Sequence, residues 1–142
     1  VRIGWRTIGV RPQRIAAIGA IMADVADEEC GEDIDTIVGI SINGIIFANE
    51  VANHLQCEVA IHRNIEGGAG KGSLSNKYGQ VSGKNIAIVD DVLSTGVTMS
   101  KTIESMREAG ANVSLCMVLV NKTLRNEVDG VPLRGLIRAA VV

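Results

Sequence analysis

Short runs of aliphatic residues alternate along the chain with longer stretches in which apolar residues recur every three or four positions. The runs are rich in β-branched residues and have the length of buried strands; they lie at residues 36–40, 57–62, 86–89, 113–120 and 133–141. The longer stretches predict helices that begin near Pro12, Gly44 and Thr98. Strands that alternate with helices at this spacing indicate βαβ units. We therefore expect one α/β domain over residues 1–142, with a mostly parallel sheet flanked by helices in three layers.

One stretch, residues 64–82, shows neither pattern, because it is polar, rich in glycine and without periodicity. Loops longer than about 12–15 residues in compact domains are usually functional or disordered. We expect a long flexible loop that closes over a site as a lid, with Lys71, Lys77 and Arg63 able to reach a bound anion. A plain β-ribbon is the alternative for the same residues.

Composition narrows the functional classes. Hydrophobic residues make up 46% of the chain but aromatic residues only 2%, which predicts an aliphatic core, and the net charge of −2 argues against a surface-wide nucleic-acid contact. No apolar run approaches the ~18 residues of a membrane span, and no signal-peptide pattern begins the chain. Cys30, Cys57 and Cys116 are widely separated, odd in number and set in apolar surroundings, which favours buried, reduced thiols. We expect a cytoplasmic protein with no membrane partner.

The most informative segment is residues 86–98, where an apolar run leads into Asp90 and Asp91 and then into a turn that opens a helix. Acids at the carboxyl end of a buried strand lie where open α/β sheets bind ligands. The N–H groups of the turn, together with the helix dipole, stabilise a phosphate. Carboxylates beside a phosphate cradle describe a sugar-phosphate site. In the alternative interpretation, the two acids only end a strand, and Ser94 or Thr98 only caps a helix.

This segment resembles the thirteen-residue phosphoribosyl-pyrophosphate (PRPP) motif of the type I phosphoribosyltransferases. The resemblance implies that Asp90 and Asp91 hold the ribose 2′- and 3′-hydroxyls and, mostly through PRPP and water, a Mg²⁺ ion. It also implies a loop that wraps the 5′-phosphate, formed by Ser94, Thr95, Gly96, Val97 and Thr98. Val97 departs from the glycine or threonine common in the family, which is a mild change if that position contributes mainly its backbone N–H.

The turn after strand 36–40 is a second candidate, because it lies on the same sheet edge as the acidic pair. In phosphoribosyltransferases the corresponding turn contacts pyrophosphate. The resemblance implies a pyrophosphate site formed by Ser41, Ile42, Asn43, Gly44 and Arg63. Orotate-type enzymes commonly carry lysine where this chain has Asn43, so the turn offers hydrogen bonds without a charge. The alternative is an ordinary strand-to-helix turn that needs Gly44.

A third polar segment follows strand 113–120 and contains Asn121, Lys122 and Arg125. Phosphoribosyltransferases often place part of the base pocket, or a subunit contact, at this position. The resemblance therefore implies one of these two roles and leaves both open.

Both ends of the chain narrow the resemblance further. The nearest branch is that of orotate phosphoribosyltransferase, and residues 5–9 and 130–138 are similar more specifically to archaeal orotate phosphoribosyltransferase-like proteins. In that group a winged-helix DNA-binding domain precedes the phosphoribosyltransferase domain, and some members regulate sugar-metabolism genes. The resemblance thus implies that residues 1–142 are the second domain of a longer protein, with any nucleic-acid contact made by the domain before it.

Two functions follow from the resemblance. The first is Mg²⁺-dependent transfer of ribose 5-phosphate from PRPP to orotate or another nucleobase by a homodimer, with release of pyrophosphate and with Asp90, Asp91, Lys71 and Lys77 in catalytic roles. The second is a ligand-sensing domain of an archaeal transcriptional regulator that binds PRPP or a nucleotide with little or no transfer. Orotate enzymes carry a Lys-x-His-Gly-type signature in the long loop, which here contains no histidine. That absence favours the sensor, whereas Lys71 and Lys77 favour the enzyme.

Overall fold

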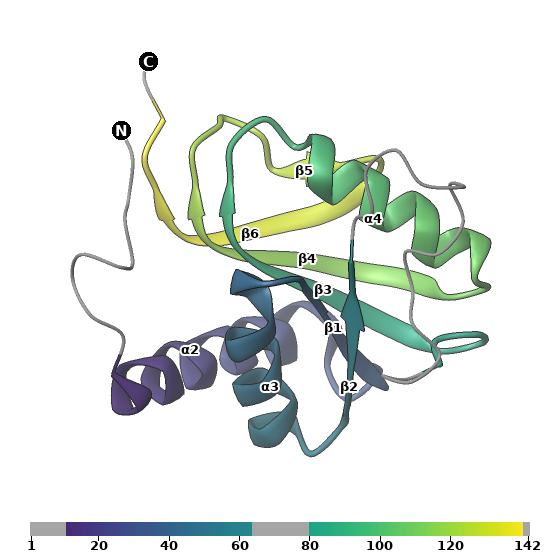
Figure 1. Cartoon of the computed structure of the whole chain (residues 1–142), viewed down its shortest axis with the longest axis horizontal. Coiled ribbons are helices and arrows are strands. Elements are labelled where there is room, and N and C mark those ends of the chain that lie inside the picture. Colours follow the sequence, from purple (N-terminus) through teal and green to yellow (C-terminus); the bar gives the residue numbers. More distant parts are fainter. Residues whose placement is uncertain (1–10, 64–79, 141–142) are drawn as a thin grey trace.

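A six-stranded sheet forms the centre of the computed structural model, which describes residues 11–63 and 80–140 (Figure 1). The strand order is β2-β1-β3-β4-β6-β5, and all neighbours run parallel except β5 and β6. The strands are β1 (Thr36–Ile40), β2 (Glu58–His62), β3 (Asn85–Leu93), β4 (Asn112–Asn121), β5 (Glu127–Val128) and β6 (Val131–Arg138). The predicted α/β fold with a mostly parallel sheet is confirmed.

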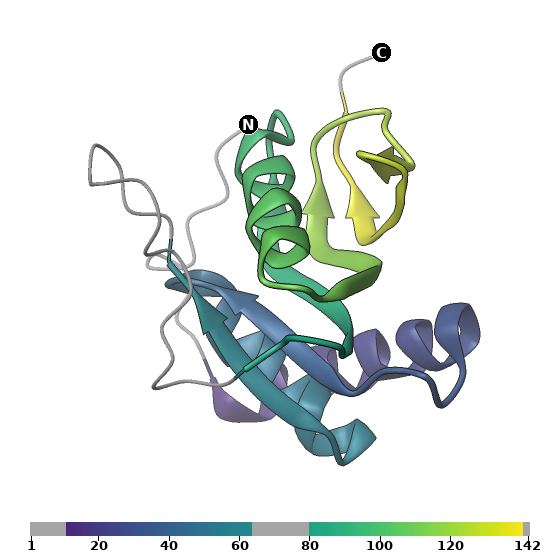
Figure 2. The same ribbon diagram turned by 90° about the vertical axis from the view of Figure 1, so that its right-hand side faces the viewer.

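Helices cover both faces of this sheet. The helices α2 (Pro12–Cys30) and α3 (Asn43–Leu55) lie on one face, and α4 (Val97–Glu108) lies on the other (Figure 2). Among the side chains of β3, Ile86 and Ile88 belong to the core under α4, while Ala87 and Val89 belong to the core under α2 and α3. Because both faces are covered, every residue of β1 is buried, which accounts for its unbroken apolar sequence.

The strand order creates a switch point between β1 and β3. The chain leaves β1 through α3 to reach β2 on one side, and it leaves β3 through α4 to reach β4 on the other side. The two connections therefore diverge at the carboxyl ends of β1 and β3. In open α/β sheets, ligands bind in the crevice that forms at such a point.

Strand boundaries differ from the sequence prediction at several places. β3 continues past the acidic pair to Leu93, since it pairs with β4 as far as Asn121. β6 begins two residues before the predicted Leu133 and ends at Arg138, short of the predicted residue 141, and the two-residue strand β5 was not predicted. The N-terminal ten residues and most of the predicted lid, with Lys71 and Lys77, lie outside the described residues.

The cysteines are reduced as predicted, but only one of the three is buried. Cys116 is buried in the sheet, whereas Cys30 and Cys57 are half-buried, and all three are free thiols. Burial raises the pKa of the Cys116 thiol to about 12, so this residue stays a neutral thiol at physiological pH. In the described ranges, no helix is both long enough and apolar enough to cross a membrane.

Candidate functional site

The first two candidate segments, residues 86–98 and the turn at residues 41–44, are in direct contact. A Cβ atom added at Gly44 would lie 2.5 Å from the carbonyl oxygen of Val89, 3.0 Å from Cα of Asp90 and 3.2 Å from Oδ1 of Asp90. Only glycine allows the first turn of α3 to approach the backbone of β3 this closely. The structure therefore brings the predicted pyrophosphate turn against the predicted ribose carboxylate, although 46 positions separate Gly44 from Asp90 in the sequence.

Uneven strand pairing opens a space beside this contact. β3 pairs with β1 only as far as Gly39 opposite Val89, but it pairs with β4 as far as Leu93 opposite Asn121. From Asp90 onward, the edge of β3 that faces β1 has no strand partner among the described residues. Asp90 is thus the first residue of β3 beyond the β1 ladder, at the switch point of the sheet.

The carboxylates of Asp90 and Asp91 both accept backbone hydrogen bonds. The N–H of Asp91 donates to Oδ1 of Asp90 at 2.8 Å, and the N–H of Val92 donates to Oδ1 of Asp91 at 2.7 Å. Asp91 is buried, with 8% exposure. The pKa of the Asp90 carboxyl is raised to about 8, mainly because the group is withdrawn from water; the hydrogen bond from the Asp91 N–H lowers it, and the charge of Asp91 raises it. Asp90 therefore carries an energetic cost when it is ionised without a ligand.

The predicted phosphate loop lies between β3 and α4. Gly96 caps α4 with φ of 95°, a left-handed conformation that favours glycine, and its carbonyl oxygen accepts the N–H of Ser100 at 2.9 Å. The Thr95 hydroxyl accepts the N–H of Val97 at 3.3 Å. A cleft of about 90 Å³ is lined by Asp90, Val92, Leu93, Ser94, Thr95, Gly96, Thr98 and Met99. One carboxylate and the start of α4 thus share a single cleft.

Val97 is the one loop residue that departs from the family pattern. Its side chain is 54% exposed, and it does not line the cleft that the other loop residues share. The position can therefore contribute its backbone N–H whatever side chain it carries. This placement explains why valine fits in a loop where glycine or threonine is common.

The remaining predicted pyrophosphate residues lie at the same sheet edge. The N–H of Ser41 donates to the carbonyl oxygen of His62 at 2.8 Å, so the residue after β2, Arg63, lies at the carboxyl edge beside the β1 turn. The Ser41–Ile42 peptide bond is cis. Ile42 is 78% exposed, and Asn43 is also exposed at the start of α3. Ser41, Ile42, Asn43, Gly44 and Arg63 are therefore brought together as predicted.

The donor set limits which metal site is possible. In the ranges that the structure describes, no group of three or more His, Cys, Asp or Glu side chains could hold a metal ion. Asp90 and Asp91 nevertheless supply hard oxygen donors. Mg²⁺ is commonly bound through one or two carboxylates together with substrate phosphates. The residues therefore fit a magnesium ion that arrives with a phosphorylated ligand, and they do not fit a cation held by protein ligands alone.

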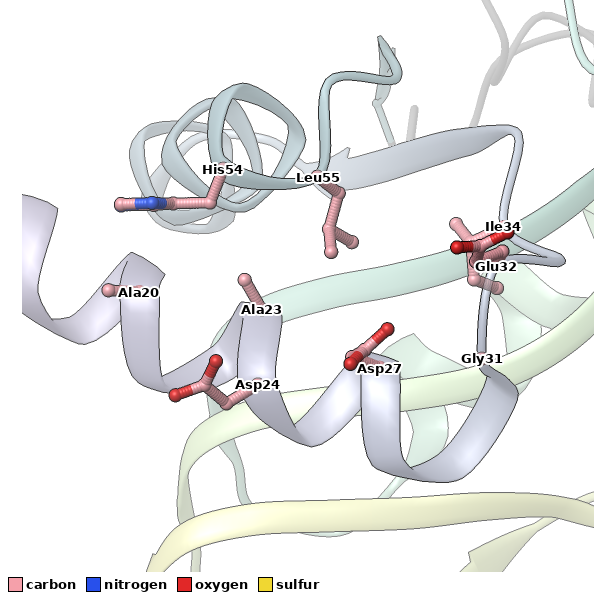
Figure 3. A pocket seen from close by; sticks show the side chains of 9 residues that line it. All are labelled: Ala20, Ala23, Asp24, Asp27, Gly31, Glu32, Ile34, His54 and Leu55. Carbon is pink, nitrogen blue, oxygen red and sulfur yellow. The ribbon is translucent and has the colours of Figure 1, made fainter.

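A larger cavity lies elsewhere. It measures about 550 Å³, opens between α2 and the end of α3, and is lined by Asp24, Asp27, Glu32 and His54 around Ala23, Leu55 and other apolar residues (Figure 3). These residues lie near the amino end of β1, because Gly31 and Ile34 precede that strand. The cavity thus lies near the amino ends of the parallel strands, whereas Asp90 lies near their carboxyl ends. Its acidic rim disfavours a phosphorylated ligand, so size does not make it the functional site.

Comparison with known proteins identifies what the chain is similar to. The model of the phosphoribosyl transferase domain family matches residues 4–139. A protein of Thermoplasma acidophilum named transcriptional regulator GfcR is 39% identical over 145 residues, which cover 100% of this chain and 73% of that protein. The transcriptional regulator GfcR 2 of Methanosarcina barkeri is 38% identical, over 97% of this chain and 71% of its own length.

Solved structures agree on the fold. Orotate phosphoribosyltransferase from Aeropyrum pernix has a TM-score of 0.67 and 25% identity, covering 84% of this chain and 70% of that one. Orotate phosphoribosyltransferase from Mycobacterium tuberculosis in complex with PRPP has a TM-score of 0.78 over 96% of this chain and 80% of its own, at 16% identity. At that lower identity the likeness concerns the fold alone.

The close approach at Gly44 predicts a measurable effect of a single methyl group. Alanine in a helix is ordinarily more favourable than glycine by about 1 kcal/mol. Gly44→Ala should instead lower the free energy of unfolding by about 1–3 kcal/mol, because its Cβ would clash with the β3 backbone. Urea unfolding measures the change, and the exposed neighbour variant Asn43→Ala should stay within about 0.5 kcal/mol. A Gly44→Ala variant more stable than the native chain would contradict the packing described.

The raised pKa of Asp90 predicts how stability depends on pH. The folded carboxyl keeps its proton up to about pH 8, whereas the unfolded one loses it near the ordinary value of 3.8. The folded state thus binds more protons between these values, so this group makes stability fall as pH rises from about 4 to 8. Asp90→Asn should remove that loss, so its free energy of unfolding at pH 8 should exceed that of the native chain by about 1–3 kcal/mol. This range is smaller than the full pKa shift would give, because solvent partly screens the carboxylate.

Urea unfolding of both proteins between pH 4 and pH 8, with a chelator present, measures this difference. The gap between Asp90→Asn and the native chain should widen as the pH rises. Asp24→Asn, at an exposed acid on α2, serves as the matched control and should follow the native curve. A gap that is constant across this range would show that Asp90 titrates normally.

Proposed function

The chain belongs to the phosphoribosyl transferase domain family, and from this premise we propose that it binds PRPP with Mg²⁺ as the ligand-sensing domain of a transcriptional regulator. The contact between Gly44 and Asp90 carries the proposal, because it joins the candidate pyrophosphate turn and the candidate ribose carboxylate at the switch point of the sheet. The two relatives named as transcriptional regulators, each matched over 97% or more of this chain, support the regulatory role.

Each part of PRPP would meet a different part of this edge. The carboxylates of Asp90 and Asp91 would accept hydrogen bonds from the ribose hydroxyls, and the N–H groups of residues 94–98 would hold the 5′-phosphate. The turn at residues 41–44 and the guanidinium of Arg63 would hold the pyrophosphate. The Mg²⁺ ion, when bound, would offset the charge of the pyrophosphate beside the two carboxylates.

Phosphoribosyl transfer to a nucleobase is the second candidate. The Aeropyrum pernix orotate phosphoribosyltransferase structure, at 25% identity, favours it, as does the pairing of a phosphate cradle with two carboxylates. The protein would act mainly by positioning the donor and by stabilising charge on the departing pyrophosphate. Lys71 and Lys77 would assist that group. Asn43 argues for weak transfer, since its amide brings no positive charge to the pyrophosphate turn.

We also propose that the domain acts in the cytoplasm as a homodimer. Ile42 and Ile46 lie one helical turn apart at the start of α3, and they are 78% and 42% exposed. Exposed apolar side chains on one helix face favour association.

Calorimetry should detect PRPP binding in the presence of Mg²⁺. The double variant Asp90→Asn with Asp91→Asn should weaken it at least about 100-fold, because each hydrogen bond to a charged group contributes roughly 1.5–3 kcal/mol. Asp24→Asn with Asp27→Asn makes the same change in net charge at the opposite end of the domain and should leave affinity unchanged. Equal affinities for the native chain and the site variant would refute the assignment of these carboxylates.

A pyrophosphate-release assay separates the sensor from the enzyme. With Mg²⁺, PRPP and orotate, uracil or purine bases in turn, the sensor should turn over well below ~1 s⁻¹, the low end of ordinary enzymes. The missing loop histidine and the uncharged Asn43 motivate this expectation, since one lost donor to a developing anion typically costs about 10²–10³ in rate. Turnover of the native chain at or above ~1 s⁻¹ with any base would establish the enzyme. Asn43→Lys should raise the rate if charge at this turn is limiting.

A further inference from the structure

An arginine from a distant segment lies against the predicted phosphate loop. A Cβ atom added at Gly96 would lie 3.1 Å from Nη1 and 3.5 Å from Cζ of Arg125. Gly96 is buried, whereas the loop residues on either side of it are exposed. The guanidinium of Arg125 therefore lies beside the middle of the loop, 29 positions away in the sequence, at the rim of the cleft and outside the residues that line it.

A network of hydrogen bonds fixes the backbone from which Arg125 extends. Asn121 is 1% exposed, and its Nδ2 donates to the carbonyl oxygen of Arg125 at 2.9 Å. Its Oδ1 accepts the N–H of Thr123 at 2.9 Å and the Thr123 hydroxyl at 2.7 Å, and the N–H of Arg125 donates to that hydroxyl oxygen at 3.1 Å. Arg138 adds a bond from Nη2 to the Arg125 carbonyl oxygen at 3.2 Å. The backbone of Arg125 is thus held at both its N–H and its carbonyl.

The segment is also tied directly to the loop strand. The N–H of Lys122 donates to the carbonyl oxygen of Leu93 at 2.9 Å, one residue before the phosphate loop begins. The segment that carries Arg125 is therefore bonded to β3 directly before the loop that contains Gly96.

Charge at the loop explains what this guanidinium can do. Residues 94–98 contain no ionisable side chain, and Asp90 lines the same cleft. A phosphate bound there would meet backbone N–H groups and a carboxylate, but no full positive charge from the loop itself. The salt bridges found among the described residues are Lys84–Glu58 and Arg134–Glu29, so none of them occupies Arg125.

We propose that Arg125 is a binding residue for the phosphate group held by residues 94–98, and that Asn121 and Thr123 act as positioning residues for it. This inference rests on the proposed function of the same site. A guanidinium donates to phosphate oxygens in a fixed planar geometry, often through two parallel bonds. The cradle would then combine the N–H groups at the start of α4 with one cation from the segment after β4.

The test uses ribose 5-phosphate as the probe, because it carries the sugar and its phosphate without pyrophosphate or a base. Arg125→Gln should weaken its binding about 10-fold or more at low salt, and the loss should shrink as salt screens this exposed cation. Lys84→Gln removes the same charge just before the amino end of β3, away from the loop, and should leave affinity unchanged. An Arg125→Gln variant with native affinity for ribose 5-phosphate would overturn the proposal, and it would do so even where PRPP binding itself is intact.

A double-variant comparison tests the positioning role. Thr123→Val removes the hydroxyl that bonds both Asn121 and the Arg125 N–H, so it should weaken ribose 5-phosphate binding several-fold, and Thr123→Ser should restore it. In the Arg125→Gln background, Thr123→Val should have no further effect. Additive losses from the two changes would show that Thr123 acts independently of Arg125. If the native chain binds neither ribose 5-phosphate nor PRPP, the proposed function fails first, and this outcome is distinct from a failure at Arg125 alone.

Discussion

The close packing of Gly44 on the backbone of β3 is the constraint on which the site depends. It fixes the start of α3 against Asp90, and so it sets the distance between a turn that can bind phosphate and a carboxylate that can bind a sugar. A side chain at this position would push the helix away from the strand. Separate elements at a sheet edge become one site here because a residue without a Cβ allows the two backbones to touch.

The same geometry places a carboxylate where it is costly. Asp90 lies at the point where the β1 ladder ends, so it is flanked by core on one side and by the cleft on the other. Burial raises its pKa to about 8, which means that the folded protein resists ionising it. If Asp90 served only to fill the core, an apolar residue would fit this position without the cost of ionisation. A half-buried acid with a raised pKa at a cleft is instead typical of a group whose charge is used when a ligand supplies hydroxyls or a cation.

Much of this arrangement could be predicted from local sequence, and the exceptions have physical causes. β1 matches the predicted range 36–40, because a short, unbroken β-branched run is typical of a strand that is buried on both faces. β6 was predicted to begin at Leu133, and Leu133 is indeed where its pairing with β4 begins; the two earlier residues pair only with β5, where Pro132 is tolerated. Short-range patterns predict elements, but they do not show which neighbour ends a ladder.

Contacts between segments that are distant in the sequence could not be predicted either. The candidate residues for the ribose and its phosphate could be predicted from residues 86–98, because the two acids and the turn are neighbours in the sequence. The segment after β4 was recognised as polar, but its sequence does not show that Arg125 lies over Gly96. The backbone that carries Arg125 is bonded to a buried amide, Asn121, and its side chain lies beside Gly96. An asparagine at a strand end is too common to be a signal by itself.

A phosphate cradle and a leaving-group site are separable parts of one scaffold, and this separation bears on how a regulator could share a fold with enzymes. In the proposed function, the ribose and its phosphate would be held by Asp90, Asp91 and the start of α4, and the structure places Asp90 and the start of α4 in one cleft. Transfer further requires charge placed against pyrophosphate in the transition state, and the β1 turn supplies only an amide from Asn43. Since binding the ground state does not itself accelerate a reaction, a domain can keep high affinity while transfer declines. A ligand that is bound and not consumed reports its own concentration, which is the property a sensor needs.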